Sequence, residues 1–193
     1  TLFRSILAGD ALFLDPFGMI AASDLSDAVK VSLIFELSDA SGSRGMVAGQ
    51  VLDMEGEHKQ LTLAELQTIH ANKTGRLLAY PFIAAGLILE LQADIGQLLE
   101  KIGKKLGLAF QVRDDILDLV ADFEVLGKTP QKDLVAEKST YPALLGLEES
   151  KALLTRELDA CEDLLDQITA ACDFDPQAIK KLIEGLQIGR EHV

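Results

Sequence analysis

The amino-acid sequence predicts an all-α protein, and three observations support this fold class. Hydrophobic residues make up 48% of the 193 residues, whereas aromatic residues make up only 5% and tryptophan is absent. A core of leucine, isoleucine, valine and alanine is therefore expected, as in packed helices. No segment of useful length alternates apolar and polar residues as a strand does. Helix start signals, and apolar residues at helical spacing, recur along the chain.

Three start signals stand out. Thr62 and Glu65 have the spacing of a capping box, Thr140 is an expected N-cap, and Asp175 precedes a proline that opens a helix. Apolar residues at helical spacing continue these helices and mark a further long amphipathic helix ending near Asp173. They are Leu66, Ile69 and Leu77 after Thr62; Leu153, Leu154, Leu158, Leu164, Leu165 and Ile168 before Asp173; and Ile179, Leu182, Ile183 and Leu186 after Pro176. Loops are expected near residues 41–43 and 55–57 and from Asp122 to about Ser139.

Charge and cysteine content exclude several classes of protein. The formal net charge is −13, and the sequence shows no basic patch of the size that nucleic-acid binding needs. Two cysteines, Cys161 and Cys172, do not make a disulfide framework, which is consistent with a reducing, cytoplasmic location. The apolar run from Leu77 to Leu89 is shorter than the ~20 residues that span a bilayer. We therefore expect a cytoplasmic protein with no nucleic-acid partner and no membrane span.

Three aspartates, Asp114, Asp115 and Asp118, lie inside the strongly apolar segment from Leu106 to Val120. At helical spacing we expect their carboxylates to converge on one face. Like charges brought together on an apolar helix are costly unless a cation compensates them. Carboxylate oxygens suit Mg²⁺ that also holds a phosphate. A solvated charged face is the ordinary alternative, and the apolar neighbours argue against it.

Nearby cations and polar groups could complete such a site. Lys73 and Thr74 supply a cation and a hydroxyl donor, which a diphosphate needs. Lys128 and Lys138 flank the loop after the aspartate helix, and Asp53 adds one more acid to a helix with little other charge. Each residue also has an ordinary role, since lysines and threonines are common on helix surfaces. The three histidines lack the spacing of a zinc site, and nucleophile motifs and dinucleotide-binding loops are absent.

Taken together, these segments resemble the trans-type isoprenyl diphosphate synthases, most closely the bacterial farnesyl or geranylgeranyl diphosphate synthases. The matching pieces run in order through the whole chain, and the aspartate block with the following Gly-Lys loop is the most specific of them. They are Gly9-Asp10-Ala11-Leu12, Gly49-Gln50 with Asp53, Lys73-Thr74-Gly75, Phe110-Gln111 with the run from Asp114 to Asp118, Leu126-Gly127-Lys128-Thr129-Pro130, and Lys138-Ser139-Thr140-Tyr141-Pro142.

The resemblance implies an isoprenoid-synthase-type bundle of long antiparallel helices around a central cavity, and it implies roles for individual residues. Asp114 and Asp118 would bind Mg²⁺, with Asp115 supporting them. Lys73, Thr74, Gln111 and Lys128 would be the catalytic residues, which contact the allylic diphosphate or stabilise the departing one. Lys138 would also bind the diphosphate, and Gln50 and Asp53 would be secondary contacts.

The resemblance also implies that a piece of the family pattern is absent from these residues. The family has a first Asp-rich motif roughly two dozen residues before the position of Gly9, and these 193 residues contain no counterpart. We therefore expect residues 1–193 to form a single helical domain that corresponds to the C-terminal two thirds of a polyprenyl synthase domain. We expect this chain to be inactive in condensation by itself.

The implied function is a Mg²⁺-dependent prenyltransferase that condenses an allylic diphosphate with isopentenyl diphosphate, acting as a homodimer. Two alternatives stay open. A terpene cyclase of the same fold would use Mg²⁺ and one diphosphate substrate, although the lysines favour chain elongation. A non-catalytic subunit would lend this half of the fold to a partner chain.

Overall fold

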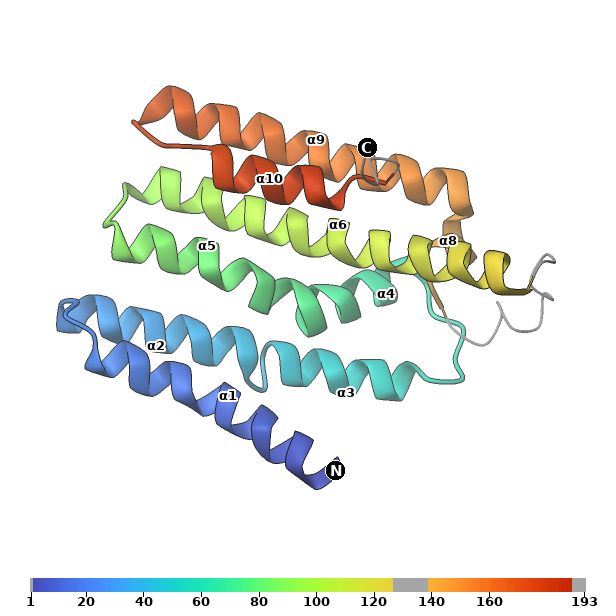
Figure 1. Ribbon diagram of the computed structural model, residues 1–193, viewed down its shortest axis with the longest axis horizontal. Helices are drawn as coiled ribbons and strands as arrows, with labels where there is room; N and C mark the ends of the chain where they lie inside the picture. The colour runs from blue at the N-terminus through green and yellow to red at the C-terminus, as the bar shows by residue number, and fades with distance from the viewer. Residues whose placement is uncertain (1, 127–138, 189–193) are drawn as a thin grey trace.

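The computed structural model describes residues 2–126 and 139–188, and these ranges are helical apart from short turns (Figure 1). The helices are α1 (Leu2–Ala22), α2 (Asp27–Ser41), α3 (Met46–Gly56), α4 (Leu63–His70), the π-helical turn η1 (Ala71–Gly75), α5 (Arg76–Ile88), α6 (Ala93–Leu126), α8 (Tyr141–Leu145), α9 (Leu147–Ala171) and α10 (Gln177–Leu186). The all-α prediction is confirmed.

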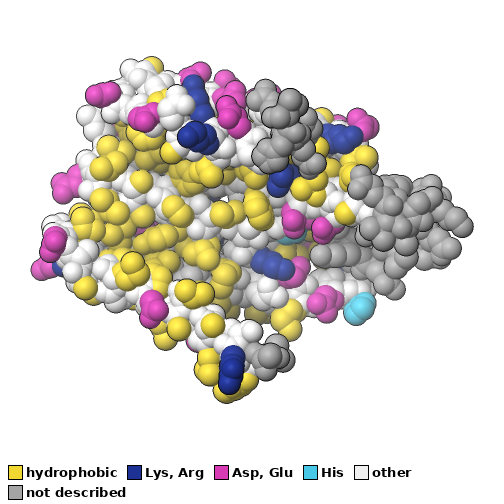
Figure 2. Space-filling model, viewed as in Figure 1, with side chains coloured by type: hydrophobic (Ala, Val, Ile, Leu, Met, Phe, Trp, Pro, Cys, Tyr) yellow, Lys and Arg dark blue, Asp and Glu magenta, His cyan; other side chains and the backbone are white. Residues whose placement is uncertain are grey.

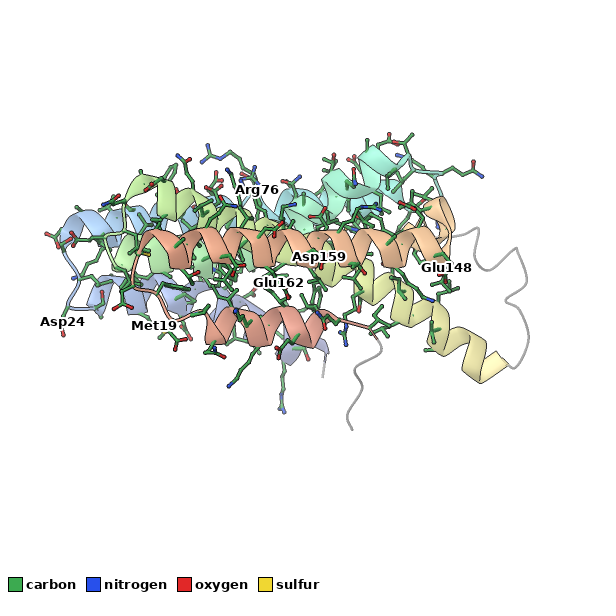
Figure 3. The ribbon with its side chains drawn as sticks, turned by 90° about the horizontal axis from the view of Figure 1, so that it is seen from above. Met19, Asp24, Arg76, Glu148, Asp159 and Glu162 are labelled. Atoms are coloured by element: carbon green, nitrogen blue, oxygen red, sulfur yellow. The ribbon has the colours of Figure 1, made fainter. Side chains whose placement is uncertain are left out.

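The helices lie nearly parallel or antiparallel to one another, with α6 in the middle (Figure 1). At 34 residues, α6 is the longest helix described, and it is about 50 Å long at 1.5 Å per residue. It packs against α5 on one side and α9 on the other. Viewed from above, α9 carries Asp159 and Glu162, with Arg76 to one side of it and Met19 to the other (Figure 3). Helix α6 therefore connects both halves of the bundle.

The core consists mainly of aliphatic side chains from α6 and α9. Ile102, Val112 and Ile116 of α6 are fully buried, as are Leu165 and Ile168 of α9. These positions recur at helical spacing on both helices, so their apolar stripes face each other. Burying a side chain of this size contributes about 1.5–3 kcal/mol relative to leaving it in water.

The predicted helix starts are confirmed. Thr62 accepts a hydrogen bond from the Glu65 backbone, and the Glu65 side chain accepts one from the Thr62 backbone, which completes the capping box. Thr140 Oγ1 accepts a hydrogen bond from the Ala143 backbone at the start of α8. The Asp175 carboxylate accepts a hydrogen bond from the Gln177 backbone at the start of α10. Local side-chain chemistry therefore sets these three starts.

Two sequence expectations about element bounds need correction. The helix predicted from Thr62 through Leu77 is interrupted by η1 between α4 and α5. The loop expected from Asp122 begins later, because α6 continues to Leu126. The first glycine or proline after Val120 is Gly127, so nothing before it in the sequence breaks the helix.

Helix α1 packs on α2 and leaves much of its apolar surface exposed. Large apolar side chains stand out from it, among them Phe3, Leu12 and Met19, each more than 70% exposed. Hydrophobic side chains also cover much of the face between α10 and α1 (Figure 2). By length and composition alone, the stretch Phe3–Ala22 is apolar enough to cross a membrane. The prediction of no membrane span was based on the run at 77–89 alone and did not include this stretch. The absence of a membrane span therefore remains a prediction.

Candidate functional site

Charged side chains gather around a cavity at the end of the bundle where α3, α4, η1 and α6 meet. Figure 2 shows side chains of both signs beside the hydrophobic area at this end. The cavity has a volume of about 380 Å³. It is lined by Asp53, Gly56, Glu57, His58, Leu61, Leu66, His70, Lys73, Gln111, Asp115 and Ser139. Four of the predicted site residues, from three different helical elements, are among them.

Lys73 and Asp53 form an ion pair across this cavity. The Lys73 Nζ lies 2.5 Å from Asp53 Oδ2, and each side chain is about one third exposed. Lys73 belongs to η1, and a single π-helical turn within a longer helix is a feature that often marks functional sites. The ammonium is thus held at the cavity wall by a carboxylate from α3.

A chain of hydrogen bonds joins η1, α6 and α8. The Thr74 hydroxyl donates to Gln111 Oε1 at 3.3 Å, and Gln111 Nε2 donates to Asp115 Oδ1 at 3.4 Å. The Tyr141 backbone N–H donates to Asp115 Oδ2 at 2.9 Å. The Thr74 proton is therefore engaged within the protein. Although Thr74 does not line the cavity, its bond to Gln111 sets which way the Gln111 amide faces.

The three predicted metal-binding aspartates differ in their surroundings. Asp115 is buried, with both carboxylate oxygens hydrogen-bonded to protein groups, whereas Asp114 and Asp118 are exposed. Successive residues on a helix are rotated by about 100°, so Asp115 turns toward α8 while Asp114 and Asp118, one turn apart, share the outer face. The expectation of three carboxylates converging on one face is met by only two of them.

The two exposed aspartates are chemically suited to Mg²⁺. Neither makes a hydrogen bond or ion pair with another residue in the described ranges. Within those ranges no three histidine, cysteine or acidic side chains come close enough together to hold a metal ion by themselves. Mg²⁺ is commonly bound by one or two carboxylates, with substrate phosphates and water completing its octahedron. Asp114 and Asp118 fit that pattern.

Two aromatic rings beside Asp115 were given no role in the sequence interpretation. The His70 and Tyr141 rings lie 5.4 Å apart, and His70 also lines the cavity. Burial, followed by the charges of Asp115 and Glu157, raises the pKa of Tyr141 well above its usual range, so this hydroxyl stays neutral. The position of His70 three residues before Lys73, hence on nearly the same helix face, was the signal available in the sequence.

Ser139 also lines the cavity and connects two distant segments. Its hydroxyl accepts a hydrogen bond from the Leu61 backbone at 3.1 Å and donates to the Lys59 carbonyl at 3.4 Å. The sequence placed Ser139 in a matching motif but gave it no contact. Of the other predicted residues, Gln50 is exposed and does not line the cavity. Lys128 and Lys138 lie outside the described residues.

Comparison with known proteins decides the family. The sequence profile of the polyprenyl synthetase family matches residues 3–174. The chain belongs to the polyprenyl synthetase family. It is 48% identical over 180 residues to the farnesyl diphosphate synthase of Micrococcus luteus, covering 93% of this chain and 62% of that protein. It is 41% identical over 189 residues to the farnesyl diphosphate synthase of Escherichia coli, covering 94% of this chain and 62% of that protein.

Solved structures of polyprenyl synthetase family proteins share this fold. A geranyltransferase of Helicobacter pylori, solved with magnesium and isoprenyl diphosphate, superposes with a TM-score of 0.78 at 31% sequence identity. The match covers 94% of this chain and 59% of that one. This polyprenyl synthetase chain therefore spans about three fifths of the length of the proteins that it matches.

Proposed function

We propose that this polyprenyl synthetase chain provides one wall of the active site of a Mg²⁺-dependent farnesyl or geranylgeranyl diphosphate synthase. Such an enzyme condenses an allylic diphosphate with isopentenyl diphosphate. The observation that carries the proposal is the arrangement on α6 and η1. Two carboxylates on the outer face of α6, which pair with no other residue in the described ranges, lie at the same end of the bundle as a lysine and a glutamine that line one cavity.

In the proposed reaction the allylic carbon–oxygen bond breaks, and the diphosphate leaves with the bonding electrons. The double bond of isopentenyl diphosphate attacks the resulting carbocation, a carbon–carbon bond forms, and a proton is then lost. When bound, Mg²⁺ neutralises charge on the diphosphate. The Lys73 ammonium contributes in the same direction, because a fixed cation stabilises charge that develops on a leaving group.

The other residues act through position. Gln111 lines the cavity with its amide oriented by Thr74, and Asp115 holds the start of α8 against α6 through the Tyr141 backbone. Asp53 keeps the Lys73 ammonium at the cavity wall. We propose that Lys128 and Lys138 contact the same diphosphate, with Gln50 as a secondary contact, on the strength of the motifs they belong to.

Metal binding tests the proposal on the 193-residue chain. Calorimetry should show weak Mg²⁺ binding alone and tighter binding with pyrophosphate, because Mg²⁺ dehydrates reluctantly and favours phosphate oxygens as ligands. Asp114→Asn should weaken the pyrophosphate-dependent binding at least about tenfold, which corresponds to ~1.4 kcal/mol. Asp159→Asn, an exposed aspartate on α9, is the matched control and should leave it unchanged. Equal Mg²⁺ affinity with and without pyrophosphate would count against the proposal.

We further propose that these 193 residues alone do not condense the two substrates. They contain one Asp-rich motif of the family type, whereas the resemblance implies two, facing each other across the cavity. Incubation with dimethylallyl and isopentenyl diphosphates should yield no prenyl product. Turnover at a rate near that of a full-length relative would show that the second motif is dispensable.

We also propose that the functional protein is a cytoplasmic homodimer. The exposed apolar side chains of α1 support the dimer, since large exposed apolar patches commonly mark interaction surfaces. Sedimentation should report twice the chain mass. A monomer at micromolar concentration would contradict the assignment.

A further inference from the structure

The glycine at position 49 brings two backbones into direct contact. A Cβ atom added at Gly49 would lie 2.0 Å from the backbone nitrogen of Lys73 and 2.4 Å from its Cα. No side chain fits at this distance, and the neighbouring atoms are backbone, which cannot rotate away. Helix α3 therefore touches η1 at the residue that carries the cavity lysine.

The same face of α3 also holds the other end of that lysine. Asp53 lies four residues after Gly49, one turn further along, so both residues face η1. Gly49 meets the Lys73 backbone, and Asp53 meets its ammonium at 2.5 Å. One turn of α3 thus spans Lys73 from the main chain to Nζ.

Helix α6 repeats this arrangement on the other side of η1. A Cβ atom added at Gly107 would lie 2.8 Å from the Cα of Gly75. Four residues later on α6, Gln111 accepts the hydrogen bond from Thr74. Each neighbouring helix therefore uses a glycine to admit the η1 backbone and a polar residue one turn on to hold an η1 side chain.

We propose that Gly49 and Gly107, named here the glycine clamp, are positioning residues for the site: by admitting η1 from both sides, they fix the Lys73 ammonium and, through Thr74, the Gln111 amide. The proposal rests on the proposed function only in assigning a diphosphate to Lys73. The clamp itself is a property of the ligand-free chain. Its loss should release Lys73 from Asp53 before any substrate is present.

The size of the disturbance differs between the two glycines. Ordinary contact begins near 3.4 Å, so an added methyl group at Gly49 requires a displacement of roughly 1.4 Å from its 2.0 Å neighbour. The same reasoning at Gly107, starting from 2.8 Å, requires only about 0.6 Å. A helical glycine with open space around it, Gly96 of α6, requires none. Three glycine-to-alanine variants therefore form a graded series.

Amine reactivity of Lys73 in the ligand-free 193-residue chain is the measurement. The chain is labelled briefly with an amine-specific acylating reagent, and each lysine is quantified by peptide mass spectrometry. Lys105 is the internal reference, because its side chain is also 35% exposed and also paired, to Glu157 at 2.9 Å on the far side of α6. The reported quantity is the ratio of Lys73 labelling to Lys105 labelling.

We expect Gly49→Ala to raise this ratio about threefold, the size of effect that losing a partly exposed ion pair gives. Gly107→Ala should raise it less, and Gly96→Ala should leave it unchanged. An unchanged ratio in folded Gly49→Ala would overturn the proposal, as would an equal rise in Gly96→Ala. If Gly49→Ala does not fold, the Asp53→Asn and Gly107→Ala variants test the proposal in its place. Asp53→Asn must then raise the ratio about threefold, and Gly107→Ala must raise it measurably.

A second arm separates this proposal from the proposed function. Adding Mg²⁺ and pyrophosphate to the unmodified chain should slow Lys73 labelling relative to Lys105. If the ligand-free series behaves as expected but pyrophosphate gives no protection, the clamp stands and the diphosphate role of Lys73 fails.

Discussion

Replacing Asp115 tests whether it supports the fold, in contrast to its two neighbours in the aspartate block. Its carboxylate accepts a 2.9 Å hydrogen bond from the buried backbone of Tyr141 and a longer one, at 3.4 Å, from Gln111. A hydrogen bond to a charged group contributes about 1.5–3 kcal/mol, and removing it leaves the Tyr141 N–H buried without that acceptor. We expect Asp115→Ala to lower the free energy of unfolding by about 3 kcal/mol.

Urea unfolding followed by circular dichroism measures this loss. With a denaturant slope of about 2 kcal/mol per molar urea, the midpoint should fall by about 1.5 M. Asp115→Asn should cost less, since an amide oxygen can still accept from Tyr141 but lacks the charge. Asp114→Ala and Asp118→Ala are matched controls on the same helix, and both should change stability by no more than about 0.5 kcal/mol. Equal midpoints for all three alanine variants would refute the assignment of a supporting role to Asp115.

Three further predictions concern titration, reactivity and packing. Burial, and after it the charges of Asp39 and Glu100, raises the pKa of Glu36, so the ionised carboxylate destabilises the folded state at neutral pH. Glu36→Gln should therefore raise the melting temperature at pH 7 and leave it unchanged below about pH 4, where the carboxyl is protonated. Burial raises the pKa of the Cys161 thiol to about 12, so iodoacetamide at pH 8 should modify Cys172 and spare Cys161 until the chain unfolds. A Cβ atom at Gly103 would lie 2.7 Å from the Cα of Ala79, so Gly103→Ala should destabilise the protein by about 1–3 kcal/mol, whereas Gly96→Ala should stabilise it by about 0.5–1 kcal/mol in the same urea titration.

Local signals predicted the helices better than they predicted the site. The capping box at Thr62 and the N-cap at Thr140 are set by residues three apart, so their sequence spacing sufficed to locate both helix starts. The π-helical turn was not predictable in this way. In space, η1 is packed between α3 and α6, and the glycines of those helices that contact it are far from it in the sequence.

The same contrast holds within the candidate site. Helical spacing correctly grouped Asp114 with Asp118, since those two residues lie one turn apart on an exposed face. It did not show that Asp115 is turned inward, because its partner, the Tyr141 backbone, lies 26 residues away across a segment whose course the sequence does not give. The Lys73–Asp53 pair was likewise hidden, because both residues had been assigned to the diphosphate rather than to each other.

The glycine contacts have a mechanical consequence. The main chains of α3 and α6 each touch that of η1, with no side chain between them to change rotamer, so the three elements form a rigid unit. Any closing motion around a ligand must therefore involve residues outside this rigid unit. Helix α8 lies outside the rigid unit, and the Asp115 hydrogen bond to the Tyr141 backbone joins it to α6. The lysine and glutamine that face the cavity would then stay still while the rest of the site moves toward them.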